Sequence, residues 1–251
     1  MEATFIIPAH NEAASLHVPD FGQAVAWIRK TFGSSEIILV DDGSTDETVR
    51  LAGAWVDEIL QQDHQGKAAA LQAGFARARG ARVFWSDADW SVPVVEAAAL
   101  NAALSRGYDY ALASRGWGRP GAPLHRWLSS CFFTAVIRQT FDWSFRDTQC
   151  GLKGARREAL DRIVPALIHF GNGSGRHAGT DAMFDIECLL VCRKLGLRAA
   201  ECPVRWMHFN NRTQQNYSPL LRQIYSDFKE IRRLYHAGHY EPGKQGTRIC
   251  I

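Results

Sequence analysis

Strand-like and helix-like segments alternate along the first half of the chain, and this alternation limits the possible folds more than any other feature. Residues 36–40 (Glu-Ile-Ile-Leu-Val) form an almost continuous aliphatic run, which is typical of a strand buried on both faces of a sheet. A helix is predicted at its carboxyl side from Ser44, because Glu47 three residues later completes the pattern of a capping box. Strands that alternate with helices of about 10 to 20 residues predict βαβ units and a mainly parallel sheet.

The same patterns extend over most of the chain and become less regular in its second half. Strands are predicted at residues 4–7, 36–40, 58–60, 82–86, 108–114 and 198–202. Helices are predicted at residues 13–32, 44–55, 66–80, 94–106, 124–141, 156–163, 181–195 and 217–235. Residues 147–154 are expected to form a loop, and the Gly- and His-containing residues 171–179 a second loop and candidate lid. We therefore expect one α/β domain over residues 1–240, with a flexible tail at 241–251.

Composition excludes several classes of protein. The 251 residues, 46% hydrophobic and 22% charged, are enough for a substantial core. A net charge of +3 is too balanced for a dedicated nucleic-acid-binding protein. The longest charge-free apolar run, residues 127–137, is far shorter than the roughly 20 residues that cross a bilayer, and the N-terminus lacks a secretory-signal pattern. We expect a cytoplasmic protein whose six cysteines are mostly buried free thiols.

Two carboxylates one residue apart, Asp87 and Asp89, follow the strand predicted at 82–86. Ligand sites in open α/β sheets lie beyond the carboxyl ends of the strands. Two carboxylates in such a turn can bind one hard divalent cation together with the phosphates of a substrate. An isolated Asp-Ala-Asp tripeptide is also compatible with a solvated turn, so the interpretation depends on what surrounds it.

Polar and acidic residues follow two other predicted strands as well. Residues 8–12 (Pro-Ala-His-Asn-Glu) come after the first strand and residues 41–44 (Asp-Asp-Gly-Ser) after the second. Gly66 and Lys67 open the third helix, where free backbone amides and a lysine suit an anion. These groups converge on one edge of the predicted sheet, which favours a ligand site there.

Together these residues resemble glycosyltransferase family 2, the GT-A nucleotide-diphospho-sugar transferases. The similarity covers about residues 3 to 206 and includes two further motifs, Asp-Thr-Gln-Cys-Gly at 147–151 and Phe-Asp-Ile-Glu at 184–187. Within the family, the chain looks most like the dolichyl- or polyprenyl-phosphate glucosyl- and mannosyltransferases. The resemblance implies a Rossmann-like, mostly parallel sheet flanked by helices, with a nucleotide-sugar-binding half at 1–115, an acceptor half at 116–240 and a C-terminal helical elaboration.

The resemblance also implies roles for individual residues. Asp87 and Asp89, the DXD motif, would bind Mg²⁺ or Mn²⁺ bridging the donor diphosphate, and the cation would neutralise charge on the leaving group. Arg115 and Gln149 would line the sugar and acceptor site, and Asp185 would be a candidate general base. The expected nucleotide-sugar-binding residues are Pro8, Ala9, Asn11, Glu12, Asp41, Asp42, Lys67, Asp87, Ala88 and Asp89.

The acceptor decides which further residues are needed. A sugar or polysaccharide hydroxyl needs a general base, whereas a polyprenyl phosphate is already an anionic nucleophile and needs cations that position it. Arg126, Arg205 and Arg212 are the candidates, beside Arg115, for contacts with such a phosphate. We expect a metal-dependent inverting hexosyltransferase that uses UDP-glucose or GDP-mannose. A hydroxyl acceptor and a non-catalytic nucleotide-sugar-binding protein are the alternatives.

Two predicted helices have apolar faces whose partners the sequence leaves open. Residues 124–141 carry a narrow polar stripe and are otherwise apolar, which suits a membrane-interface helix, a prenyl groove, or burial in this protein or a dimer. Residues 217–235 carry an apolar stripe that includes Ile224, Tyr225 and Ile231, and docking against the core is the favoured interpretation. If the acceptor is a lipid and no segment spans the membrane, we expect the protein to contact the inner face of the membrane peripherally.

Overall fold

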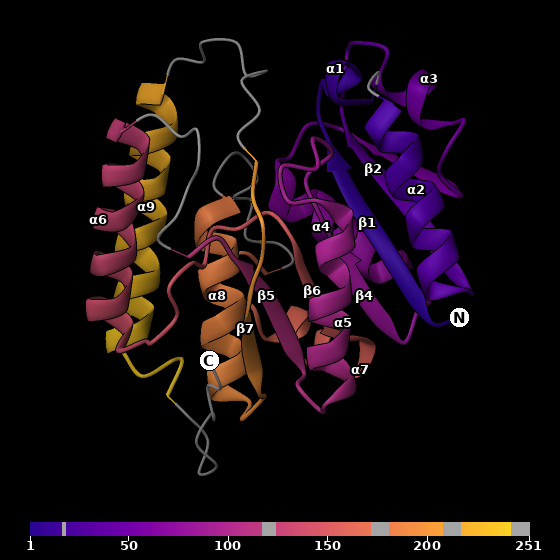
Figure 1. Cartoon of the computed structure of the whole chain (residues 1–251). Coiled ribbons are helices and arrows are strands. Elements are labelled where there is room, and N and C mark those ends of the chain that lie inside the picture. Colours follow the sequence, from indigo (N-terminus) through magenta and orange to yellow (C-terminus); the bar gives the residue numbers. More distant parts are fainter. Residues whose placement is uncertain (17–18, 117–123, 172–180, 208–216, 242–251) are drawn as a thin grey trace.

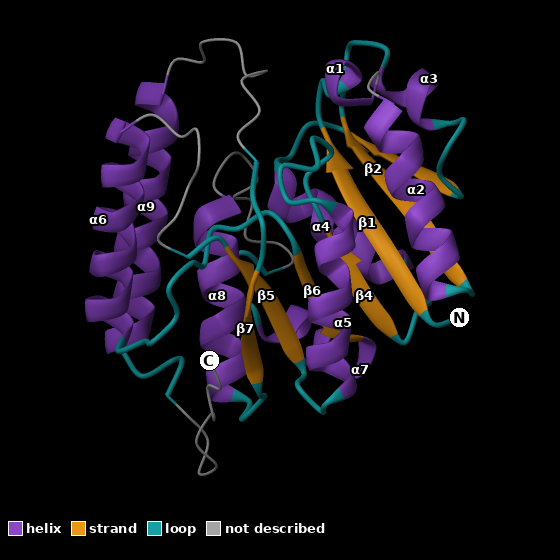
Figure 2. Ribbon diagram, viewed as in Figure 1, coloured by secondary structure: helices purple, strands orange, loops and turns teal. Residues whose placement is uncertain are grey.

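The computed structural model describes residues 1–16, 19–116, 124–171, 181–207 and 217–241, and the structural statements below refer to these residues. They form one seven-stranded sheet with helices on both faces (Figures 1 and 2). The strands are β1 (Ala3–Ala9), β2 (Ser35–Asp42), β3 (Glu58–Gln62), β4 (Arg82–Trp85), β5 (Tyr110–Ser114), β6 (Lys153–Arg156) and β7 (Ala199–Pro203). The helices are α1 (Ala13–Leu16), α2 (Pro19–Phe32), α3 (Thr48–Ala52), α4 (Lys67–Arg77), α5 (Ala97–Ser105), α6 (Leu124–Phe141), α7 (Arg157–Ile163), α8 (Asp181–Lys194) and α9 (Tyr217–His236), with short 3₁₀ helices η1 (Val94–Glu96) and η2 (Val164–Ala166).

The sheet is mostly parallel, as the sequence predicts. The strand order is β3-β2-β1-β4-β6-β5-β7, and β6 alone among these strands runs antiparallel to its neighbours. The carboxyl ends of β1, β2 and β4 therefore point the same way, and the loops that follow them meet at one edge of the sheet.

Alternate residues of the central strands feed two hydrophobic cores, one on each face. Ile6 and Ile38, paired between β1 and β2, face a core built with α4, α7 and α8. Ile7 and Leu39 face the other core, built with α2 and α5. All four side chains are fully buried, which explains why the sequence of these strands is continuously aliphatic rather than alternating.

Several elements differ from the prediction. The single helix expected at 13–32 is two helices, α1 and α2, and the second begins at Pro19, a residue suited to a first helical turn. The loop expected at 147–154 ends in a strand, β6. The helix expected at 94–106 starts as the 3₁₀ helix η1 and becomes α-helical at Ala97. The candidate lid at 171–179 and the tail at 241–251 lie outside the described residues except for their first residues, Gly171 and Glu241.

The predicted capping box at Ser44 is wrong. Helix α3 begins at Thr48, and Glu47 before it makes no side-chain cap. The Ser44 hydroxyl instead accepts a hydrogen bond from the backbone N–H of Asn11 at 2.9 Å. Ser44 thus joins two loops at the sheet edge, because its hydroxyl is bound to the distant residue Asn11 instead of capping a helix.

Helices α6 and α9 lie side by side at one end of the molecule (Figure 1), and α9 also contacts α8. The ring of Phe141 in α6 lies 5.1 Å from that of Tyr235 in α9, and Ile231 is fully buried, so the predicted docking of α9 is confirmed for its carboxyl half. The outer surface of this helix pair is not covered by the rest of the described chain: Phe132 of α6 is 73% exposed and Tyr225 of α9 is 68% exposed. No helix in the described ranges is long and apolar enough to cross a membrane.

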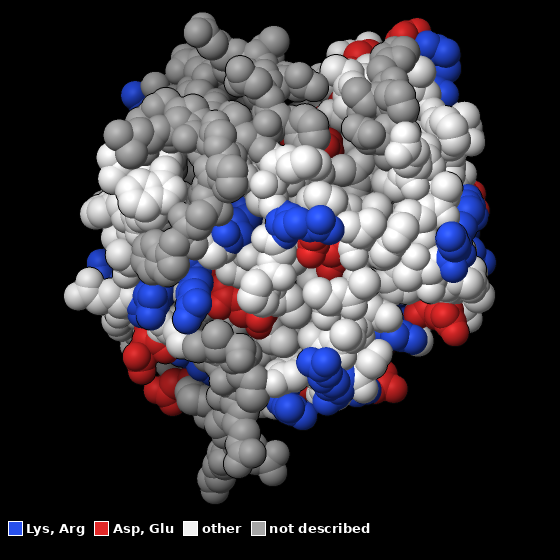
Figure 3. Space-filling view, in the orientation of Figure 1, with Lys and Arg blue, Asp and Glu red and all other residues white. Residues whose placement is uncertain are grey.

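The distribution of charges and the state of the cysteines agree with what the composition predicts. Basic and acidic side chains are interspersed on the face shown in Figure 3. Five cysteines lie in the described residues; all are free thiols, and each except Cys131 is buried. Burial raises the pKa of the Cys150 thiol to about 12, so this thiol is protonated at neutral pH.

Candidate active site

A pocket of about 230 Å³ lies where the loops after β1, β2, β3 and β4 meet. It brings together most of the residues predicted to bind a nucleotide sugar, and adds four that were not in that set. The predicted residues in its lining are Pro8, Ala9, Glu12, Asp42, Lys67, Asp87 and Ala88. The added residues are His10, His64, Gly66 and Ala70. Asn11, Asp41 and Asp89 are predicted site residues that do not line this pocket.

Asn11 holds the loop after β1 against the loop after β2. Its side-chain oxygen accepts a hydrogen bond from the N–H of Thr45 at 2.8 Å, and its backbone N–H donates to Ser44 as described above. The neighbouring Glu12 N–H donates to the hydroxyl of Thr48 at 2.8 Å. Asn11 has φ of +55°, a left-handed conformation that asparagine tolerates better than most residues. Its role in the structure is to shape the pocket wall.

Asp42 organises the loop between β3 and α4. Its buried carboxylate accepts hydrogen bonds from the backbone N–H groups of Gln65 at 2.8 Å and Gly66 at 2.7 Å, and from the side chain of Gln62 at 2.7 Å. Asp41, also buried, accepts from the N–H of Ser44 at 3.3 Å. Asp42 therefore fixes the start of α4, and it borders the pocket while doing so.

Two stacked histidines form part of the pocket lining. The rings of His10 and His64 lie 4.1 Å apart and 26° from parallel. Nδ1 of His10 is 2.8 Å from the backbone carbonyl oxygen of Asp42, and because a carbonyl only accepts, that nitrogen carries the proton. The sequence prediction missed His64. Its position directly after the third predicted strand was the signal that could have found it, since that strand also ends at this edge of the sheet.

Asp87 lies between a lysine and a glycine. Its Oδ1 is 2.6 Å from Nζ of Lys67, the first residue of α4. Its Oδ2 lies against Gly151, where a Cβ atom would come within 2.3 Å of it. The contact with Gly151 brings the loop before β6 against the pocket. Asp89, in contrast, accepts a hydrogen bond from the N–H of Ser91 at 2.9 Å.

The two carboxylates fit a cation that is shared with a ligand. Asp87 and Asp89 are hard oxygen donors on one short loop, as Mg²⁺ and Mn²⁺ require. In the described part of the chain no group of three or more His, Cys, Asp or Glu side chains is placed to hold a metal ion. Water molecules and the oxygens of a bound diphosphate would complete the coordination, which is how Mg²⁺ is commonly bound with nucleotides.

Arg115 follows β5 and is fixed by Asp147. Its Nε and Nη2 donate to the two carboxylate oxygens at 2.6 Å and 2.7 Å, in a bidentate pair that is largely buried. Burial alone would lower the pKa of Arg115, but the hydrogen bonds and charge of Asp147 outweigh it and raise that pKa above its ordinary value. The guanidinium also lies 5.9 Å from the ring centre of Trp206. Gln149, on the same loop, donates its N–H to Asp147 at 3.1 Å.

Asp185, the candidate base, forms a buried ion pair. Its Oδ2 is 2.6 Å from Nζ of Lys153, and both side chains are less than a tenth exposed. Lys153 also donates to the carbonyl oxygen of Cys150 at 2.5 Å. The neighbouring acid Glu187 is fully buried and accepts hydrogen bonds from the backbone N–H groups of residues 168–170 and from the hydroxyl of Tyr240. Glu187 therefore has a structural role.

Of the predicted phosphate-binding arginines, the structure describes the side chains of Arg115 and Arg205. Arg205 pairs with Glu96 at 2.7 Å, and its side chain is 79% exposed. The side chain of Arg126 and the whole of Arg212 lie outside what the structure describes. Arg115 is thus the arginine of the four that the described structure places in the loops around the pocket.

Comparison with known proteins agrees with this geometry. Similar proteins include the dolichyl-phosphate beta-glucosyltransferase of Drosophila melanogaster, 29% identical over 82% of this chain and 67% of that protein. Another is the undecaprenyl-phosphate 4-deoxy-4-formamido-L-arabinose transferase of Pseudomonas fluorescens Pf-5, 32% identical over 64% of this chain. The chain spans about half the length of that transferase and of its Pseudomonas counterparts.

The fold is also that of solved GT-A enzymes. The crystal structure of glucosyl-3-phosphoglycerate synthase from Mycobacterium tuberculosis, in complex with Mn²⁺, UDP-glucose and phosphoglyceric acid, covers 92% of this chain with a TM-score of 0.65 and 20% identity, over 80% of its own length. The family model described as glycosyl transferase family 2 matches residues 4–164, which include β1 to β6 and the whole pocket. The chain therefore belongs to glycosyltransferase family 2 and has the GT-A fold.

Proposed function

We propose that this protein transfers a hexose from a nucleotide sugar, UDP-glucose or GDP-mannose, to a polyprenyl phosphate, with inversion at the sugar carbon and with Mg²⁺ or Mn²⁺ as cofactor. The observation that carries the proposal is the contact between Asp87 and Gly151. This contact connects two groups of residues. The first is the pocket at the strand ends, with Lys67 and Asp87 in its lining. The second is the loop of Gln149, Cys150 and Gly151, which is linked to Arg115 because Asp147 accepts hydrogen bonds from both Gln149 and Arg115.

The donor assignment rests on the chemistry of the pocket. A nucleoside diphosphate needs cations for its phosphates and polar groups for its base and ribose. Lys67 supplies one fixed cation, and Asp87 with Asp89 can hold a divalent one. The bound metal would supply charge stabilisation to the departing diphosphate. Asp42 holds the start of α4, so the backbone that carries Lys67 is in place before the donor arrives.

The acceptor assignment rests on what surrounds Asp185. A carboxylate that is buried and paired with Lys153 is poorly placed to take a proton from a sugar hydroxyl. A phosphate acceptor is anionic without help and requires positioning instead. Arg115, held in one orientation by Asp147, is the candidate for that task. Two of the similar proteins are named for transfer to dolichyl phosphate and undecaprenyl phosphate, which supports the same acceptor class.

A lipid acceptor implies contact with a membrane surface, which we place at the cytoplasmic face. The exposed side chains of Leu128 and Phe132 lie one helical turn apart on α6. Tyr225 is exposed on the adjacent helix α9. Aromatic and leucine side chains of this kind suit the boundary between headgroups and acyl chains.

The test is a transfer assay with purified protein, radiolabelled UDP-glucose or GDP-mannose, Mn²⁺, and a short polyprenyl phosphate in detergent. Labelled lipid is expected with one of the two donors, and excess chelator should abolish it. Asp87→Asn should lower the rate at least about a hundredfold, since it removes a charge that the metal requires. Asp161→Asn, an exposed carboxylate on α7, is the matched control and should retain the full rate.

The same assay separates the alternatives. Labelled product with a sugar or phosphoglycerate hydroxyl acceptor, and none with polyprenyl phosphate, would replace the proposed acceptor. Binding of UDP- or GDP-sugars without transfer to any acceptor would indicate a non-catalytic nucleotide-sugar-binding protein.

A further inference from the structure

Lys67 occupies a position that the helix itself disfavours. It is the first residue of α4, and the amino end of a helix carries a partial positive charge that repels a lysine. Gly66 before it has φ of +86° and makes no side-chain cap. The ammonium group therefore gains nothing from the helix. Its positive charge is stabilised by Asp87, whose Oδ1 lies 2.6 Å from Nζ.

The carboxylate of Asp87 contacts Gly151 as well as this lysine. Its second oxygen lies against Gly151, so closely that even a methyl group at that residue would overlap it. The side chains of Lys67 and Asp87 are 21% and 27% exposed, so the pair is partly shielded from solvent. The charge of Asp87 also acts on Arg115 and raises its pKa, which indicates that a second cation is near. Lys67 therefore compensates part of the negative charge of Asp87.

We propose that the ammonium group of Lys67 is a resident cation on Asp87, which competes with the divalent metal until a nucleoside diphosphate binds. This inference rests on the proposed function, because it assumes the metal site at Asp87. A divalent ion approaching the protein alone meets two carboxylates, one of which is already paired. A diphosphate adds negative oxygens that can bind both Lys67 and the metal, so the two ligands bind cooperatively.

Replacing Lys67 should therefore change the affinity for the metal and the affinity for the nucleotide in opposite directions. Removing the charge of Lys67 frees Asp87 for the metal but removes a phosphate partner. Lys67→Met should therefore tighten binding of Mn²⁺ alone by about three- to tenfold. The same variant should weaken binding of UDP or GDP in saturating Mn²⁺ by at least about tenfold. A phosphate-binding lysine without the competing role would produce only the second effect.

The experiment measures Mn²⁺ binding to the full chain by electron paramagnetic resonance, without nucleotide, and UDP and GDP binding by calorimetry with Mn²⁺ present. Lys67→Arg, which keeps the cation, should bind Mn²⁺ alone as the wild type does. Lys30→Met, at an exposed lysine of α2, is the matched control and should change neither affinity. In an Asp87→Asn background, Lys67→Met should no longer tighten Mn²⁺ binding. Circular dichroism and melting temperature establish that each variant is folded.

The failures of the two proposals are distinguishable. Unchanged or weaker binding of Mn²⁺ alone in folded Lys67→Met would overturn the competition between lysine and metal, and would leave the proposed function standing. No Mn²⁺ binding by the wild type, with UDP or with GDP, would overturn the metal-dependent function and this inference with it.

Discussion

At the scale of single residues, the site depends on side chains whose positions are set by close neighbours. Asp42 is tied to the loop before α4, Arg115 to Asp147, and Asp87 to Lys67. The sequence predicted that Asp42, Lys67 and Asp87 would gather, because strand ends converge at one edge of a parallel sheet, whereas the role of Arg115 was implied only by the family resemblance. It could not predict the pairing of Lys153 with Asp185, which lie 32 residues apart and meet only through the packing of β6 against α8.

Gly151 gives a direct test of the link between the two halves of the site. In Gly151→Ala, the new methyl group would lie 2.3 Å from Oδ2 of Asp87, so the carboxylate must move. Because a side-chain end can yield at small cost, we expect a loss of stability below about 1 kcal/mol but at least about a tenfold loss of Mn²⁺-dependent transfer. Gly53→Ala is the control, since its methyl group would find its nearest neighbour at 3.6 Å. Equal activity in the two variants would contradict a positioning role for Gly151.

Asp185→Asn distinguishes a structural ion pair from a general base. If the acceptor is a phosphate, the folded variant should keep at least about a tenth of the wild-type transfer rate, because no proton has to be removed from the acceptor. The unpaired charge left on Lys153 is expected to cost about 3 to 5 kcal/mol of stability. The double variant Lys153→Met, Asp185→Asn removes that charge and should regain part of the stability. A loss beyond about a hundredfold in variants shown to be folded would support a base instead.

At the scale of elements, the long helices of the second half of the chain were predicted best. The bounds of α6 agree with the sequence at both ends, and α8 and α9 differ by one residue. Strand β6 was missed because its four residues, Lys-Gly-Ala-Arg, carry no apolar alternation. It exists because β4 and β5 provide hydrogen-bonding partners on both sides, and Gly154 lets the ring of Phe84 approach within 2.6 Å of where a side chain would be.

The outer face of α6 carries a prediction that concerns this element alone. Phe132 is 73% exposed, so replacing it should leave stability within about 0.5 kcal/mol of the wild type. Phe132→Asp should nevertheless lower binding to vesicles that contain anionic lipid by at least about threefold, because it places a charge where an apolar ring would enter the interface. Co-sedimentation with such vesicles measures this, and Gln23→Asp, at an exposed position of α2, is the control. Unchanged vesicle binding in Phe132→Asp would argue against α6 as the lipid-facing element.

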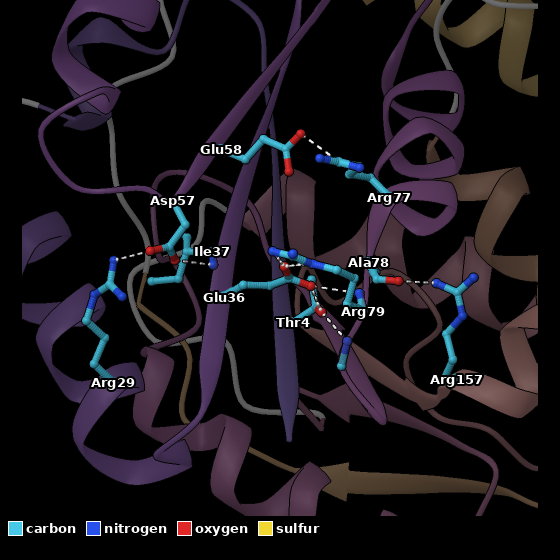
Figure 4. A network of polar contacts seen from close by, with 11 residues as sticks. Thr4, Arg29, Glu36, Ile37, Asp57, Glu58, Arg77, Ala78, Arg79 and Arg157 are labelled. Atoms are coloured by element: carbon cyan, nitrogen blue, oxygen red, sulfur yellow. Dashed lines mark hydrogen bonds and ion pairs between the residues drawn. The ribbon is translucent and has the colours of Figure 1, made fainter. Parts of the chain in front are cut away.

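At the scale of the whole molecule, charged side chains have different surroundings at the two ends of the sheet. The carboxyl ends of β1, β2 and β4 border the pocket, whereas a network of ion pairs and hydrogen bonds lies around the amino ends of β1, β2 and β3 (Figure 4). Glu36 near the start of β2 is its centre, bonded to Thr4 at 2.6 Å and to the side chain and backbone of Arg79 at 2.6 to 2.8 Å. Sequence patterns predicted a ligand site at the carboxyl ends of these strands, where the pocket lies, because polar and acidic residues follow them. They did not identify this network, whose partners come from separate elements.

This network predicts how the stability of the protein depends on pH. Burial raises the pKa of Glu36, but the hydrogen bonds from Thr4 and Arg79 and the charge of Arg79 outweigh it, so the pKa lies below its ordinary value of 4.5. Because the unfolded chain binds the proton more readily, this contribution to stability is present above about pH 5 and is lost as the pH falls through the folded-state pKa. Glu36→Gln should therefore cost about 1 to 3 kcal/mol at pH 7, and the difference from the wild type should shrink toward pH 3.5. Urea unfolding at the two pH values measures it, with the exposed Glu2→Gln as control; a difference that stayed constant or grew with acid would show that the charge of Glu36 does not stabilise the fold.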